Sequence, residues 1–91
     1  MYIMDRKILI VDDEADIRDI LQFNLENAGF NVETASSAEE AMAVLSNRHS
    51  LILLDVMMHG MSGFQMAARL REEGNMIPIN FLPRTILRMI C

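Results

Sequence analysis

The chain alternates between short apolar runs and longer segments whose apolar residues recur every three or four positions. Two of the runs, residues 8–11 and 51–54, contain no polar residue. Runs of this length without alternation are typical of strands buried on both faces of a parallel sheet. Shorter segments at 30–35 and 77–82 carry β-branched and aromatic residues and are also expected to be strands. The pattern therefore predicts four strands.

Amphipathic helices are expected in the three intervals between these strands. Residues 14–28 carry an apolar stripe, and Gly29 follows as a natural C-terminal stop. Two further helices, ending near residues 46 and 73, begin with a serine followed three positions later by Glu or Gln, which is the sequence of a capping box. Strands that alternate with helices of this length predict right-handed crossovers and a parallel α/β sheet.

Length and composition restrict the class of protein. With 91 residues, 52% of them hydrophobic and 23% charged, the chain is expected to form one globular domain at most. Its net charge of -5 argues against direct binding to nucleic acid, since no basic cluster is present. The single cysteine, Cys91, and the lack of a signal peptide core or a membrane-length apolar stretch favour a cytoplasmic protein without a membrane segment.

Acidic residues follow both of the wholly apolar runs. Asp12 and Asp13 come directly after the first run, and Asp55 comes directly after the other. Because the carboxyl ends of parallel strands meet at one edge of the sheet, the three carboxylates are expected to converge there. Clustered carboxylates are typical ligands of a hard divalent cation such as Mg²⁺, which relieves their repulsion. A single aspartate at a strand end is also a common turn former or helix cap, so the prediction depends on the group of three.

Three segments of the chain resemble the receiver domain of two-component response regulators. They are residues 8–14 (ILIVDDE), 51–63 (LILLDVMMHGMSG) and 77–82 (IPINFL), and the resemblance covers residues 6–82 in register. It implies a flavodoxin-like, CheY-like three-layer α/β fold. The strand order of the complete family is 2-1-3-4-5, which implies order 2-1-3-4 for the strands expected here.

The resemblance also implies roles for particular residues. Asp55 matches the aspartate that accepts a phosphoryl group from a histidine kinase, and Asp12 and Asp13 match the family's acidic pair. The backbone carbonyl of Met57 matches the remaining protein ligand of the Mg²⁺ ion. These roles make the chain a phosphoacceptor rather than an enzyme acting on other molecules, with Mg²⁺ as its cofactor and a histidine kinase as its partner.

The chain departs from the family pattern in two places. His59 stands where the family usually has proline, so the loop after Asp55 loses a restraint on φ and is expected to be looser. From Pro83 the sequence no longer follows the family. We therefore expect an incomplete receiver domain over residues 1–82, without the fifth strand and the last two helices. Residues 83–91 are then a tail foreign to the family, and one hypothesis for the tail is a shift of reading frame.

Self-association and loss of activity are the expected consequences of that departure. Removing a fifth strand and a last helix would expose a strand edge and an apolar face, and both promote formation of a dimer or larger assembly. The leading hypothesis is a phosphoacceptor impaired by the missing part. The alternative is a fragment that cannot be phosphorylated and acts only in self-association or partner binding.

Two other functions of α/β proteins are also weighed against the residues. A phosphohydrolase that forms an aspartyl-phosphate usually carries a second aspartate two residues after the first, where this chain has Met57. A nucleotide-binding flavodoxin relative would need a glycine-rich phosphate loop, and none follows Val11.

His49 and His59 are expected in loops facing solvent, because neither has metal-ligand spacing to another His or Cys.

Overall fold

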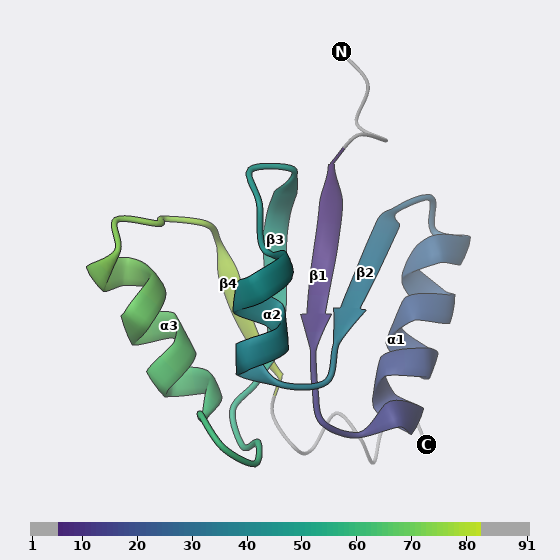
Figure 1. Ribbon diagram of the computed structural model, residues 1–91. Helices are drawn as coiled ribbons and strands as arrows, with labels where there is room; N and C mark the ends of the chain where they lie inside the picture. The colour runs from purple at the N-terminus through teal and green to yellow at the C-terminus, as the bar shows by residue number, and fades with distance from the viewer. Residues whose placement is uncertain (1–5, 83–91) are drawn as a thin grey trace.

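A parallel sheet lies at the centre of the structure, a computed structural model that describes residues 6–82 (Figure 1). Its strands are β1 (Lys7–Val11), β2 (Asn31–Ala35), β3 (His49–Asp55) and β4 (Ile79–Leu82), in the order β2-β1-β3-β4. All three neighbouring pairs run parallel, which confirms the predicted sheet and its order. The expected tail, residues 83–91, lies outside the described residues.

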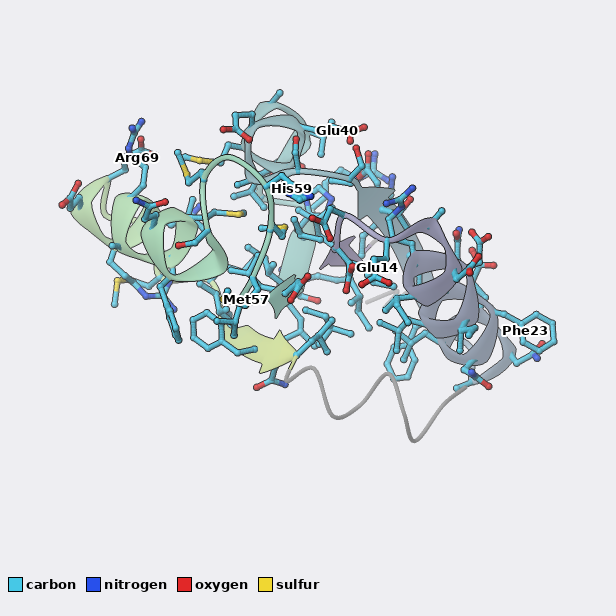
Figure 2. The ribbon with its side chains drawn as sticks, turned by 90° about the horizontal axis from the view of Figure 1, so that it is seen from below. Glu14, Phe23, Glu40, Met57, His59 and Arg69 are labelled. Carbon is cyan, nitrogen blue, oxygen red and sulfur yellow. The ribbon has the colours of Figure 1, made fainter. Side chains whose placement is uncertain are left out.

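Helices cover both faces of the sheet and give three layers. The helices are α1 (Ala15–Asn27), α2 (Ala38–Val44) and α3 (Gly63–Glu72). Figures 1 and 2 show α1 on one face and both α2 and α3 on the other. Within residues 6–82, none of these helices combines the length and apolar character that crossing a bilayer would require.

The main core lies between the sheet and the pair α2 and α3. Its fully buried members alternate along the central strands and face short or flexible side chains of the helices, because parallel strands present every second residue to the same layer. They are Leu9, Val11, Ala35, Ala38, Ala41, Ile52, Leu54, Met66 and Leu70. On the opposite face, Ile8 and Ile10 are buried beside α1, whose only buried residue is Ile17. This layering holds the carboxyl ends of β1 and β3 side by side.

The predicted capping box is complete at the start of α3, whereas at α2 only its serine half forms. The Ser62 hydroxyl accepts a hydrogen bond from the Gln65 N–H at 3.1 Å, and the Gln65 side chain accepts one from the Ser62 N–H at 2.8 Å. At α2 the Ser37 hydroxyl accepts from the Glu40 N–H, but the Glu40 carboxylate reaches one residue further back, to the N–H and hydroxyl of Ser36. Two of the four unpaired N–H groups at the start of α3 thereby gain partners, and one of the four does so at the start of α2.

The expectation that His49 faces solvent is wrong. This residue is the first of β3 and only 5% exposed. Its Nδ1 accepts a hydrogen bond from the Ser46 N–H at 3.1 Å, so Nε2 carries the proton and donates to the Glu33 carboxylate on β2 at 2.8 Å. The Lys7 ammonium lies 4.0 Å from the same carboxylate. The histidine therefore belongs to a polar network that joins the amino ends of β1 and β3 to the middle of β2, away from the acidic residues at the opposite edge.

Candidate functional site

Three carboxylates converge at the carboxyl edge of the sheet, as the spacing of the acids predicts. Asp55 is the last residue of β3, and Asp12 and Asp13 directly follow β1. Because Val11 is paired with Leu54 in the ladder, these strands end at the same height. One oxygen from each of the three carboxylates lies within 4.8 Å of the others.

The site combines burial with an excess of negative charge. Asp12 is 3% exposed and Asp55 is 4% exposed, whereas Asp13 is half-buried. Burial, with a smaller contribution from the charges of Asp55, Asp13 and Glu14, raises the pKa of Asp12 to about 6. The Glu14 N–H opposes this change, because it donates a hydrogen bond to Asp12 Oδ1 at 2.8 Å. The ionised site is therefore electrostatically strained in the absence of a cation.

A backbone N–H donates to each of the other two carboxylates as well. The Met57 N–H donates to Asp55 Oδ1 at 3.1 Å, in a local turn like the one between Glu14 and Asp12. The His59 N–H donates to Asp13 Oδ2 at 3.2 Å, from a loop that lies 46 positions later in the chain. Main-chain groups thus fix the orientation of all three side chains.

The loop between β3 and α3 is held against Asp55 by a glycine. A Cβ added at Gly63 would collide with the backbone carbonyl oxygen of Asp55, and the Gly63 N–H donates to the Val56 carbonyl at 3.0 Å. Gly60 has a φ of 76°, in the left-handed region that glycine adopts at little cost, and it turns the loop after His59. These contacts place the start of α3 directly beside the candidate acceptor.

An open hollow of about 500 Å³ adjoins the acidic group. It is lined by Asp13, Glu14, Met57, Met58 and His59. In Figure 2, which looks onto this edge of the sheet, Met57 and His59 lie on the loop before α3, and Glu14 lies before α1. A small anionic group entering this hollow would meet the acidic residues first.

Two contributors to the site could not be read from the residue pattern. Arg18 on α1 donates from Nη1 to the Asp12 backbone carbonyl at 2.8 Å and so ties the helix to the end of β1. Its position one turn into an amphipathic helix gave no signal of this contact. Gly63 appears in the matching segment, but its close approach to Asp55 becomes visible only in three dimensions.

The donor set fits Mg²⁺. Hard divalent cations take oxygen ligands, and the three carboxylates supply oxygens within a small volume. The pKa of Asp12 is raised first by burial and then by the neighbouring negative charges, and a divalent cation would offset both by stabilising the ionised carboxylates. The structure therefore brings together the predicted Asp12, Asp13 and Asp55, with Met57 lining the adjoining hollow.

Comparison with known proteins assigns a family to this arrangement. The sequence model of the response regulator receiver domain matches residues 8–85. Over 80 residues the chain is 44% identical to PhoP of Bacillus subtilis, a transcriptional regulatory protein of alkaline phosphatase synthesis. That alignment covers 87% of this chain and 33% of PhoP, so the chain spans about a third of the relative's length.

Two solved structures resemble this chain in fold and sequence. The response regulator TrrA of Thermotoga maritima, solved in complex with Mg²⁺ and BeF, is 33% identical with a TM-score of 0.73. The match covers 84% of this chain and 65% of TrrA. A second structure, of the histidine kinase ThkA in complex with TrrA, matches with 35% identity and a TM-score of 0.78, over 87% of this chain and 69% of that one.

Proposed function

Because the chain belongs to the response regulator receiver domain family, we propose that it accepts a phosphoryl group on Asp55 in a Mg²⁺-dependent reaction. The single observation that carries this proposal is the group of three carboxylates at the ends of β1 and β3, with oxygens within 4.8 Å. Only Asp55 among them ends a central strand beside the start of α3. We assign it the role of nucleophile.

The transfer needs little chemistry from the protein beyond position and charge. A carboxylate oxygen of Asp55 attacks the phosphorus atom and forms a P–O bond, while the bond from phosphorus to the donor breaks. The electron pair of that bond leaves with the donor, which is an imidazole nitrogen of a phosphohistidine or the oxygen of an acyl phosphate. The Met57 N–H, which donates to Asp55 Oδ1, holds the carboxylate in one orientation for this attack.

Asp12, Asp13, Asp55 and the backbone carbonyl of Met57 would hold the Mg²⁺ ion. When bound, the ion offsets negative charge on the carboxylates and on the phosphoryl oxygens. Arg18 ties the main chain of Asp12 to the start of α1 and so restrains the position of the acidic pair. The Mg²⁺ complex of TrrA supports this assignment by similarity of fold and sequence.

A phosphorylated histidine kinase is the partner that fits this chemistry. TrrA, with which the chain shares its fold, was solved together with the kinase ThkA. The reaction modifies the chain itself, so the chain is a phosphoacceptor rather than an enzyme that turns over a separate substrate. This assignment applies to the part of the longer relatives that the chain matches, which is about a third of PhoP.

Incubation with acetyl phosphate and Mg²⁺, followed by mass spectrometry of the intact chain, tests the proposal. We expect one added phosphoryl group in the wild type, dependence on Mg²⁺, and no addition in Asp55→Asn. Asp19→Asn is the matched control, because Asp19 is exposed on α1 away from the site. Absence of any adduct in the wild type, or an adduct that persists in Asp55→Asn, would contradict the assignment. The first of these outcomes would favour the alternative of a self-association module.

Self-association is a second property that a specific observation favours. Within residues 6–82, β4 is paired on one side only, with β3. Phe81 of β4 and Phe64 of α3 lie with ring centroids 4.9 Å apart, yet they remain 39% and 59% exposed. An open strand edge next to exposed aromatic rings favours pairing with a second copy.

Light scattering tests this property. We expect the wild type to exceed the monomer mass and Phe81→Asp to shift toward the monomer. Phe23→Asp is the control, because Phe23 is exposed on α1 on the opposite face. A monomeric wild type would argue against pairing through β4.

A further inference from the structure

We propose that the backbone N–H of His59 is a positioning group for Asp13 and that the residue type at position 59 thereby sets the affinity of the site for Mg²⁺. The inference rests on the metal site described under the proposed function. It adds a residue whose contribution comes from its main chain and not from its imidazole ring.

The three N–H groups that orient the carboxylates differ in how they are built. Those of Glu14 and Met57 lie two residues after the aspartate that each one contacts. Such local turns form whenever the chain bends after a strand and need no other part of the fold. The bond from His59 to Asp13 instead joins the loop after β3 to the loop after β1. It is the one of the three that depends on how the two loops meet.

Of the three carboxylates, Asp13 is the one whose orientation depends most on this hydrogen bond. The other two are almost fully buried, so their neighbours restrict their movement, whereas Asp13 is half-buried at the rim of the hollow. A carboxylate has two oxygens, and one can accept the N–H while the other binds a cation. Hydrogen bonds to metal ligands orient those ligands, and their loss costs about 10–100-fold in metal affinity.

Residue type matters at position 59 because proline alone lacks a backbone N–H. A proline here, which the resembled family pattern usually has, would lack this donor. In this chain the His59 N–H supplies a hydrogen bond to a proposed metal ligand. The residue at position 59 thus connects the loop after β3 to the site.

A pair of substitutions separates the main chain from the side chain. His59→Ala removes the imidazole and keeps the N–H, whereas His59→Pro removes both. Mg²⁺ affinity is measured by calorimetric titration of the full chain. We expect His59→Ala to bind as the wild type does and His59→Pro to bind about tenfold more weakly or worse. Equal affinity in the wild type and His59→Pro would overturn the inference, as would an equal loss in both variants.

Amide exchange with water, measured by NMR without Mg²⁺, tests the same bond independently of metal binding. In Asp13→Ala the His59 amide is expected to lose protection, while the Met57 amide, bonded to Asp55, keeps it. An unchanged His59 amide would overturn the inference even if His59→Pro failed to fold. In His59→Pro the Met57 and Glu14 amides are expected to stay protected. Loss of protection at both would show that proline distorts the loops, which would also overturn the positioning role.

The two proposals fail in different ways. A wild type that binds no Mg²⁺ contradicts the metal site and therefore the proposed function. A wild type that binds Mg²⁺ with the same affinity as His59→Pro leaves the proposed function in place and removes only the role of His59.

Discussion

Replacing Asp12 by Asn is expected to stabilise the metal-free fold. Asparagine has nearly the same shape and keeps an oxygen that can accept the hydrogen bond from the Glu14 N–H. It removes the charge, which burial and then the neighbouring acids disfavour, so that the pKa of Asp12 rises from 3.8 to about 6. A pKa difference of roughly two units corresponds to about 3 kcal/mol of unfavourable free energy in the ionised folded state.

The effect has a definite sign with pH. The folded chain holds the Asp12 proton up to about pH 6, whereas the unfolded chain releases it near the ordinary value of 3.8. Between these values the folded state binds more protons, so the wild type loses stability as the pH rises and reaches a constant level above the window. Asp12→Asn has no such titration. Its advantage should therefore be small at about pH 4 and near its full size at about pH 8.

Thermal and urea unfolding without divalent cations measure this difference. For a domain of this size each kcal/mol moves the melting temperature by roughly 4–8 °C, so a gain of more than 10 °C is within reach near pH 8. Mg²⁺ should then stabilise the wild type but not Asp12→Asn, since only the wild type keeps the full set of ligands. Asp19→Asn, on the exposed surface of α1, is the control for simple charge removal.

Two results would refute this account of Asp12. One is an Asp12→Asn variant that is no more stable than the wild type near pH 8. The other is a stability difference that does not shrink toward acid pH. Either would mean that hydrogen bonds or water compensate the buried charge, contrary to the burial of its side chain.

Three further substitutions test separate contacts. Gly63→Ala should destabilise the fold by about 1–3 kcal/mol and slow phosphorylation, because a Cβ would push α3 away from Asp55; wild-type unfolding and kinetics would contradict the close approach. Ser62→Ala should cost about 1 kcal/mol in urea unfolding through loss of the helix cap, with no change in Mg²⁺ affinity. His49→Leu should lower the free energy of unfolding by about 1–3 kcal/mol, because Glu33 and the other polar group bonded to the ring lose that hydrogen bond. An unaltered unfolding midpoint would contradict that network.

The sheet and its order could be predicted because each central strand carries its own signal. The runs at 8–11 and 51–54 have no polar residue, which is typical of central strands in a sheet with helices on both faces. The convergence of the three carboxylates follows from that arrangement alone. The start of the short strand β4 was harder to predict from the sequence. Pro78 provides no N–H to the ladder, and the residue pairing with β3 begins at Ile79 rather than at Ile77.

The contacts that sequence could not predict are those made by the main chain or across the sheet. The N–H of His59 has no signature in the residue pattern, since every residue type except proline carries one. The burial of His49 depends on Glu33, which lies 16 positions earlier on a neighbouring strand. A histidine next to a turn signal resembles a loop residue until its partners are known.

Because all the strands in the sheet run in the same direction, one edge of the sheet holds their carboxyl ends and the opposite edge holds their amino ends. Asp12, Asp13 and Asp55 lie at one edge, so the turns at the other edge lie away from the proposed phosphorylation site. At the turn between α1 and β2, residues 28–30 are exposed and Gly29 has nothing within 4 Å of an added Cβ. A fluorophore or an affinity handle inserted there would report on this protein in a living cell while leaving the edge that carries the three aspartates untouched.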